Sequence, residues 1–260
     1  MKLYRLGLLS VALTTTLFGG AANADEMSSG SINHDIKFGG VIIGALPEWH
    51  WVLPTLITRI DLEQGAATNA SGVNTWDILE NHKNPLHLLE GYMDATTPGI
   101  PFNNLSPLIS YVQGGATVTT TTTGGLVTLP LEAEANDGTK GTLKLTITPV
   151  LLASNGAPAG GTLTVQPMPN QIASPDTAVP IIYNAALTKL ETKLGDVTGA
   201  TGTTYVNTEL NGSYLDNGQD SANPVIAGYA SGITAGELSF TDAITPTMWK
   251  SVFTVQVAYN

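Results

Sequence analysis

The side chains that most often carry enzyme chemistry are few and poorly spaced in this chain. His82 and His87 stand five residues apart without the H-E-x-x-H pattern of a zinc peptidase, and cysteine is absent. The segment Gly228-Tyr-Ala-Ser-Gly232 is one residue off the spacing of a nucleophile elbow. Carboxylates are scattered through predicted loops, so no pair stands out for acid–base catalysis. The sequence therefore predicts neither an enzyme nor a bound cofactor or metal.

The first 24 residues predict a secretory leader. Lys2 and Arg5 precede an apolar stretch over 6–18, and Ala22-Asn-Ala24 has the small-x-small pattern of a cleavage site. This stretch is shorter than the roughly 20 apolar residues that span a bilayer. We therefore expect export and cleavage, which would leave one domain of 236 residues.

The composition predicts an acidic, turn-rich β protein. The formal charge of −11 becomes −13 when Lys2 and Arg5 leave with the leader, and such a surface repels phosphate backbones, so nucleic-acid binding is not expected. The chain has 28 glycines and 15 prolines, with few of the charged residues from which helices are usually built. Without cysteine, its stability must come from packing and strand pairing.

Both ends of the mature chain predict apolar strands. The stretch from Trp249 to Asn260 alternates with period two, and the same is true of the stretch from Ser31 to Gly40. The apolar face of the terminal strand carries Phe253, Val255, Val257 and Tyr259, and that of the opening strand carries Ile32, His34, Ile36 and Phe38. An apolar strand at a chain end must dock against a partner.

The middle of the chain predicts further strands. Trp49 and Trp51, two residues apart, should point to one face and anchor a sheet. A turn at Asn136-Asp-Gly138 predicts a hairpin between the alternating stretches 126–131 and 141–148. Further strands are expected at 224–233 and 237–241.

Three stretches have helix-like patterns, and the fold is expected to contain one or two short helices. Thr75 would cap one over 75–80, Pro85 would start one over 85–90, and the most convincing runs from Asn184 to Leu194 before Gly195. Before this last helix, a Gly-, Pro- and Ala-rich stretch over 153–177 is expected to run over the surface, with at most a short strand at Leu163 and Val165.

Four stretches together resemble the subunits of chaperone/usher fimbriae, in particular adhesive major subunits of the FaeG type from enterotoxigenic bacteria. They are Ile36-Lys-Phe-Gly-Gly40, Trp49-His-Trp51, Tyr229-Ala-Ser-Gly-Ile-Thr-Ala-Gly236 and the terminal strand that ends in Tyr259-Asn260. The resemblance implies an immunoglobulin-like sandwich that lacks its last strand, a donor-strand extension over 25–40 and a subunit domain over 41–260 with an insertion around 153–217. His34 departs from the family, in which a small residue is usual at that point.

The resemblance also implies the partners of the chain. The donor strand, with Ile32, His34, Ile36 and Phe38, would fill the groove of a neighbouring copy or related subunit by donor-strand complementation. Phe253, Val255, Val257 and Tyr259 would line that groove and pair first with a periplasmic chaperone. An outer-membrane usher would then export the polymer to the cell surface. The FaeG type also binds host glycans through inserted segments, and Tyr205, Tyr214 and Asp216 are candidates for that contact.

Two alternatives share part of this pattern. An outer-membrane β-barrel would have the same leader, acidity and alternation, although barrels usually end on the aromatic residue itself. A self-contained periplasmic glycan-binding module would keep the sandwich but need no neighbour. Trp49 and Trp51 could then stack on sugars, although core packing is the better interpretation of both.

Overall fold

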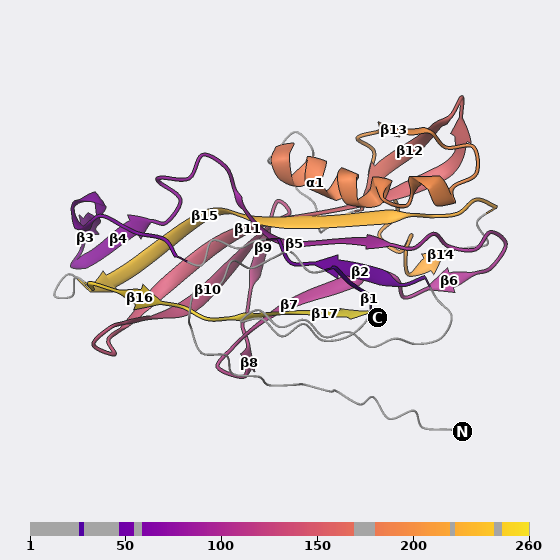
Figure 1. Cartoon of the computed structure of the whole chain (residues 1–260). Helices are drawn as coiled ribbons and strands as arrows, with labels where there is room; N and C mark the ends of the chain where they lie inside the picture. Colours follow the sequence, from indigo (N-terminus) through magenta and orange to yellow (C-terminus); the bar gives the residue numbers. More distant parts are fainter. Residues whose placement is uncertain are drawn as a thin grey trace, which may run out of the picture.

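The computed structural model describes residues 26–28, 47–54, 59–168, 180–218, 222–241 and 246–259. Strands dominate these ranges, and they contain one α-helix, α1 (Pro180–Glu191), with short 3-10 turns at η1 (Gln64–Ala66) and η2 (Leu194–Asp196). The predicted all-β sandwich is confirmed. Figure 1 shows an elongated molecule in which β15 runs most of the length.

One large sheet forms the body of the molecule. Its main path is β1 (Glu26–Ser28), β2 (Trp49–Val52), β5 (Leu86–Met93), β15 (Ala227–Thr241), β11 (Lys140–Ala159), β10 (Leu126–Ala135) and β16 (Trp249–Lys250). Three branches pair with this path. β4 (Val73–Asp77) pairs with β15 and carries β3 (Thr68–Ala70), and β9 (Thr121–Thr123) pairs with β10. β12 (Thr162–Pro167) pairs with β11 and carries β13 (Gly202–Tyr205). The described pairs are antiparallel except for β12 with β13.

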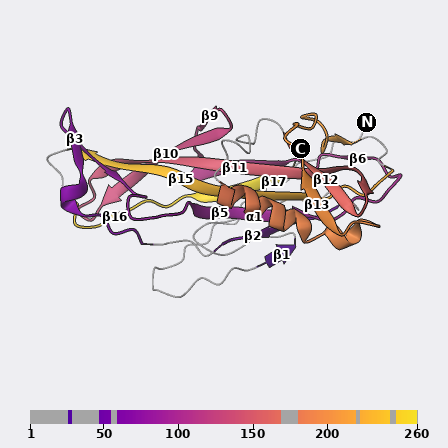
Figure 2. The ribbon, with the colours of Figure 1, turned by 90° about the horizontal axis from the view of Figure 1, so that it is seen from above.

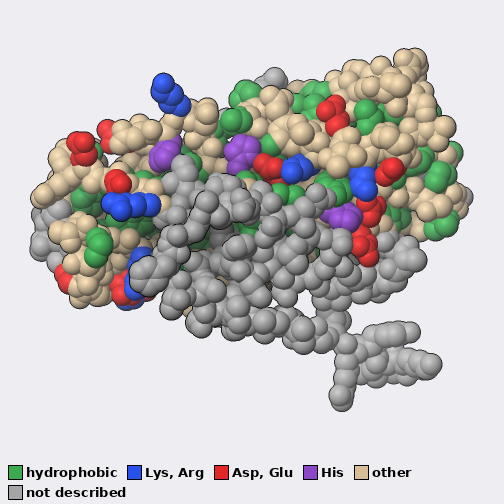
Figure 3. Space-filling view, viewed as in Figure 1, with side chains coloured by type: hydrophobic (Ala, Val, Ile, Leu, Met, Phe, Trp, Pro, Cys, Tyr) green, Lys and Arg blue, Asp and Glu red, His purple; other side chains and the backbone are tan. Residues whose placement is uncertain are grey.

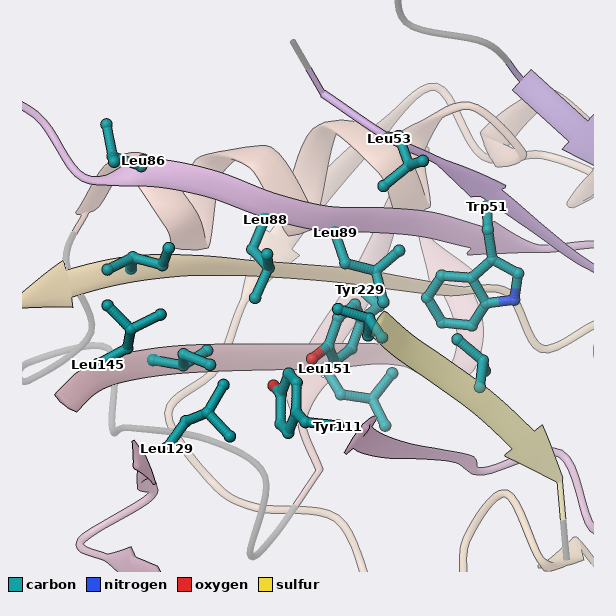
Figure 4. Close-up of a cluster of buried hydrophobic side chains, with 14 of the residues drawn as sticks. Trp51, Leu53, Leu86, Leu88, Leu89, Tyr111, Leu129, Leu145, Leu151 and Tyr229 are labelled. Atoms are coloured by element: carbon teal, nitrogen blue, oxygen red, sulfur yellow. The ribbon is translucent and has the colours of Figure 1, made fainter. Parts of the chain in front are cut away.

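A small sheet covers one face of the large one. It contains β17 (Thr254–Tyr259), β7 (Pro107–Gln113) and β8 (Ala116–Thr117), in that order. A further two-stranded sheet joins β14 (Asn217–Gly218) to β6 (Phe102–Asn103). Side chains from both layers form the main core, which includes Tyr111, Leu129, Leu145, Leu151 and Tyr229 (Figure 4).

Helix α1 covers part of the opposite face of the large sheet. A second core lies beneath it, where Val150 and Leu152 of β11 meet Ile182, Ala186 and Leu190 of the helix. Figure 2 shows α1 lying along β15 and β5. In this half of β11, neighbouring residues therefore point into two different cores, and the strand is a continuous buried run from Ile147 to Ser154.

Proline is accommodated in β11 at a change of partner. Pairing with β10 ends at Ile147, and pairing with β12 begins at Leu152. Pro149 falls between these two points and faces Ser231 of β15 on the other edge. A residue without an N–H group is tolerated there because no neighbouring strand requires its hydrogen bond.

Two glycines of β15 let α1 approach the sheet closely. A Cβ atom at Gly228 would fall on main-chain atoms of Ala186 and Leu190, and one at Gly232 would fall on the side chain of Ile182. At Gly228 only a residue without a Cβ fits under the helix, whereas a Cβ at Gly232 would require the Ile182 side chain to move.

Several predicted elements are confirmed. The hairpin around Asn136–Gly138 is formed by β10 and β11, with Leu129 opposite Leu145 and Leu131 opposite Leu143. Trp49 and Trp51 are buried on one face, and their rings stack with centroids 5.1 Å apart. They belong to the core rather than to an exposed sugar platform.

Other predictions are wrong. The helices expected over 75–80 and 85–90 are the end of β4 with a turn, and β5. The strands expected separately over 224–233 and 237–241 form the single strand β15. The stretch expected to cover the surface from 153 contains the end of β11, and the short strand allowed at Leu163 and Val165 is β12, in which both side chains are buried.

The helix expected from Asn184 to Leu194 exists but is displaced. It begins at Pro180 and ends at Glu191, so Asn184 lies inside it and does not cap it. Its fully buried stripe is Ile182, Ala186 and Leu190.

Candidate functional site

Strand β17 pairs along one edge only, as far as the described ranges extend. It runs antiparallel to β7, with Val255 opposite Tyr111, Val257 opposite Ile109 and Tyr259 opposite Pro107. No described strand pairs with its other edge, which makes it the outer strand of the small sheet. An edge strand presents a row of main-chain donors and acceptors that another strand can use.

The inner face of β17 is part of the main core. Val255 and Val257 are 0% and 3% exposed. Phe253 and Tyr259 are half-buried against the same core, and Phe253 packs against the ring of Tyr111 with centroids 6.2 Å apart. The four residues predicted for the terminal strand therefore share one face. Phe253, however, precedes the bounds of β17, because the segment is interrupted at 251–253.

Trp51 fastens the far end of β17 to the large sheet. Its indole Nε1 donates a hydrogen bond to the hydroxyl of Tyr259 at 2.6 Å, and its ring lies edge-on to Tyr229. Trp49 makes a parallel link by donating to the carbonyl of Leu105, two residues before β7. Burial raises the pKa of the Tyr259 hydroxyl, so this hydroxyl is protonated at physiological pH. Figure 4 shows Trp51 beside the strand that carries the C-terminus.

The near end of β17 is reached by a change of sheet. Trp249 and Lys250 pair with β10 of the large sheet, whereas Thr254 pairs with Val112 of β7 in the small sheet. The intervening Ser251 donates its hydroxyl to the carbonyl of Glu132 in β10 at 2.8 Å. The terminal segment therefore bridges the two layers before it becomes the edge strand.

The predicted donor strand lies outside the described residues, and so do its four apolar-face positions, Ile32, His34, Ile36 and Phe38. Its role stays a prediction. Residues 26–28, directly after the predicted leader, are described, and their backbone pairs with β2 in the register Glu26 to Val52 and Ser28 to His50.

The three glycan candidates do not form one cluster. Tyr205 lies in β13, packs edge-on against Tyr183 at 4.9 Å and borders the core under α1, whereas Tyr214 borders the main core. The hydroxyl of Tyr214 donates to the carbonyl of Ser154 at 3.0 Å, and burial raises its pKa.

Asp216 is engaged within the protein as well. Its carboxylate accepts the main-chain N–H of Ser106 at 3.0 Å, just before β7 begins. It thus helps hold the β13–β15 connection beside the start of β7.

Two carboxylates, one in β5 and one just after it, contact α1 and the turn that follows the helix. The carboxylate of Glu90 lies 2.6 Å from the Nδ1 atom of His87 and 3.2 Å from the Nζ atom of Lys189 in the helix. All three side chains are more than two-thirds buried, which makes the cluster stiffer than a surface ion pair. Figure 3 shows acidic, basic and histidine side chains interspersed along the described part of this face.

Asp94 makes the second contact of this kind. Its carboxylate lies 2.7 Å from the Nζ atom of Lys193 and 3.0 Å from the Nε2 atom of His50, while Lys193 also covers the ring of Tyr92 at 5.3 Å. Partial burial favours the neutral acid, but the hydrogen bonds from Lys193 and His50 outweigh it and lower the pKa of Asp94. We call the Glu90 and Asp94 contacts the helix seam.

The described ranges lack two other functional features, a metal-binding cluster and a membrane-spanning helix. They contain no group of three or more His, Cys, Asp or Glu side chains able to hold a metal ion. They also contain no helix long and apolar enough to cross a membrane.

A family model described as "Fimbrial, major and minor subunit" matches residues 4–260, which is nearly the whole chain. No curated protein matches the chain at a significant level. The family match spans every described element from β1 to β17.

Proposed function

Because the chain belongs to the family of fimbrial major and minor subunits, we propose that it polymerises by donor-strand complementation, with β17 accepting the leading segment of another copy. A fimbrial subunit is a structural protein of a surface fibre. In this proposal a periplasmic chaperone first occupies the edge of β17, and an outer-membrane usher then exchanges the chaperone for the next subunit.

The observation that carries the proposal is that no described strand pairs with the outer edge of β17, while its inner face is packed into the main core. The six residues of this strand pair with β7 along one edge and with no described strand along the other, while Val255 and Val257 are buried. A buried main-chain group without a partner costs roughly 1 to 3 kcal/mol. An arriving strand would satisfy such groups in a row, which is the basis of β-strand addition.

The leading segment has the chemistry of the missing strand. Ile32, Ile36 and Phe38 would enter the groove from one face, and burying each would contribute about 1.5 to 3 kcal/mol. His34 would enter with them, and its imidazole is bulkier than the small residue usual there. Its placement would make the exchange of chaperone for subunit sensitive to pH near its ordinary pKa of about 6.5.

The test is deletion of residues 25–40 behind an intact leader. The full chain co-expressed with its chaperone and usher is expected to give a ladder of multimers on a gel without boiling. The shortened chain is expected to bind the chaperone but to give no ladder. When both are expressed together, the shortened chain should act as a terminator and shift the ladder to shorter lengths. A ladder of unchanged length from the shortened chain alone would overturn the proposal.

Host glycan recognition is the finer part of the proposed function. Tyr214 and Asp216 bond to main-chain groups of distant segments, whereas the Tyr205 hydroxyl donates to the exposed side chain of Asn207 at 3.3 Å, so Tyr205 is the better of the three candidates. We expect Tyr205→Ala to reduce binding of the assembled fibre to host glycoconjugates, while Tyr214→Phe should lower stability and leave binding per folded subunit unchanged. If the Tyr205→Ala fibre bound host glycoconjugates as well as the parent fibre, Tyr205 in β13 would have no role in recognition.

A further inference from the structure

The side-chain amide of Gln113 forms with Glu132 the pair of hydrogen bonds that a main-chain peptide group of a paired strand would form. Its Oε1 atom accepts the N–H of Glu132 at 2.7 Å, and its Nε2 atom donates to the carbonyl of the same residue at 2.9 Å. The Nε2 atom also lies 3.3 Å from the Ser251 hydroxyl and 3.2 Å from the Val252 carbonyl. One side chain therefore joins the end of β7, the middle of β10 and the crossing segment that leads into β17.

The alternation of β17 leaves its register open. A slip of one residue would turn Val255 and Val257 out of the core, so burial forbids it. A slip of two residues returns apolar side chains to the same face, and burial alone opposes it far less. Another contact must therefore select among registers that differ by two.

We infer that Gln113 sets the register of β17 and so decides which of its groups meet the incoming strand. The amide of Gln113 fixes where the chain leaves β10, and the bond from Trp51 to Tyr259 fixes where β17 ends. Between these two fastenings the outer edge of β17 has no described partner. Gln113 is a positioning residue for the acceptor edge, and this inference rests on the proposed function.

The natural absence of cysteine allows the register to be measured by disulfide trapping in the full chain, expressed with its leader. Leu108 faces Ala258 in the native register, and both are exposed. Cysteines at these two positions lie within disulfide reach across paired strands. Cysteines at Ser110 and Ala258 are diagonal in the native register, about 7 to 8 Å apart, and face each other only after a slip of two.

In the parent chain we expect the Leu108→Cys, Ala258→Cys pair to close and the Ser110→Cys, Ala258→Cys pair to stay open. Gln113→Leu is expected to raise closure of the second pair about tenfold relative to the first, because it removes every amide bond at the crossing. An unchanged ratio in folded Gln113→Leu protein would overturn the inference.

A matched control separates register from stability. Gln166 is also a bridging amide, donating to the carbonyl of Thr208 at 2.7 Å in the half of the molecule under α1. Gln166→Leu should lower the melting temperature without closing the slipped pair. Equal closure in both variants would show that any loss of stability loosens β17, and the assignment to Gln113 would fail.

A milder pair of variants keeps the test decisive if Gln113→Leu does not fold. Ser251→Ala removes the bonds of this hydroxyl to Glu132 and Gln113 before β17, and Tyr259→Phe removes the bond from Trp51 at its end. Their combination should raise slipped closure several-fold, and no rise would overturn the inference. The multimer ladder of the parent chain reports the proposed function independently, because a failed ladder leaves the register of the single chain unaffected.

Discussion

The half of the molecule under α1 and the edge at β17 differ in how far the described chain covers its own sheets. Under α1, the sheet is covered on both faces by the chain itself, and consecutive residues of β11 are buried in two cores. At β17, the chain completes the inner face but leaves one edge without a described partner. A helix covers the sheet in the first region, whereas in the second region the edge strand pairs with one described strand.

The two regions also differ in where their hydrogen bonds, ion pairs and close approaches lie. The helix sits on glycines and is fixed by the helix seam, so its position is set by shape and charge within one chain. The edge strand is instead fixed at its two ends, by Gln113 and Trp51, with apolar packing between them. This arrangement fixes both ends of a strand whose outer edge pairs with no described strand.

The closed half should fail most severely when a side chain is placed beneath α1. Gly228→Ala puts a Cβ atom into main-chain atoms of Ala186 and Leu190, and we expect a loss of about 3 kcal/mol. Thermal unfolding measures this effect. Gly202→Ala in β13, where a Cβ meets open space, is the matched control and should change stability by less than about 1 kcal/mol. Equal effects would show that helix packing does not depend on this approach.

The main core, which both regions share, should fail in alkali. Burial raises the pKa of Tyr229 to about 12 and raises that of Tyr111 as well. A raised folded-state pKa means that the associated stability is complete below pH about 10 and is lost as pH rises through the folded value. We expect a loss on the order of 2 kcal/mol from Tyr229, seen as phenolate absorbance that rises together with unfolding. Phenolate formation by Tyr229 or Tyr111 in a folded protein near pH 10, identified as the absorbance that is lost in the corresponding Tyr→Phe variant, would contradict the burial of these rings.

The end of the edge strand should respond to a smaller change. Trp51→Phe keeps an aromatic ring but removes the donor to Tyr259, and we expect a loss of about 1 kcal/mol. Tyr259→Phe should cost the same, and the double variant should cost little more than either single variant, because both remove one bond. Fully additive losses in denaturant unfolding would show that the two residues act separately.

The helix seam should give the smallest effect, and it should appear in acid. The lowered pKa of Asp94 means that its stabilising contact is complete above pH about 3.9 and is lost as pH falls through the lower folded value. Because the carboxylate is partly solvated, we expect Asp94→Asn to cost less than about 1 kcal/mol at neutral pH. The variant should also flatten the loss of helical signal in acid. An acid transition identical to that of the parent would exclude Asp94 as its cause.

The elements that the sequence predicts well are those whose signals are local. The turn at Asn136–Gly138 fixed the β10–β11 hairpin, and alternation placed Val255 and Val257 on one buried face. β5 was missed because of a bulge opposite Ser231 and Gly232, which buries both Leu88 and Leu89 and imitates helical spacing.

The contacts that the sequence does not predict join distant residues. Gln113 meets Glu132 and Val252, and Trp51 meets Tyr259, across separations that carry no periodic signal. The break at 251–253 was missed for the same reason, since alternation continues through it while the strand changes sheets. Glycines under α1 could be recognised only once the helix was placed on β15.

In the proposed assembly, β17 accepts the leading segment of another copy. The most direct measurement is the melting temperature of the mature chain lacking residues 25–40, with and without a synthetic peptide of residues 31–40. We expect a marginal fold that the peptide stabilises by many degrees, with no effect from a peptide carrying Asp at Ile36 and Phe38. A shortened chain that is heat-resistant and monomeric alone, and indifferent to the peptide, would contradict it.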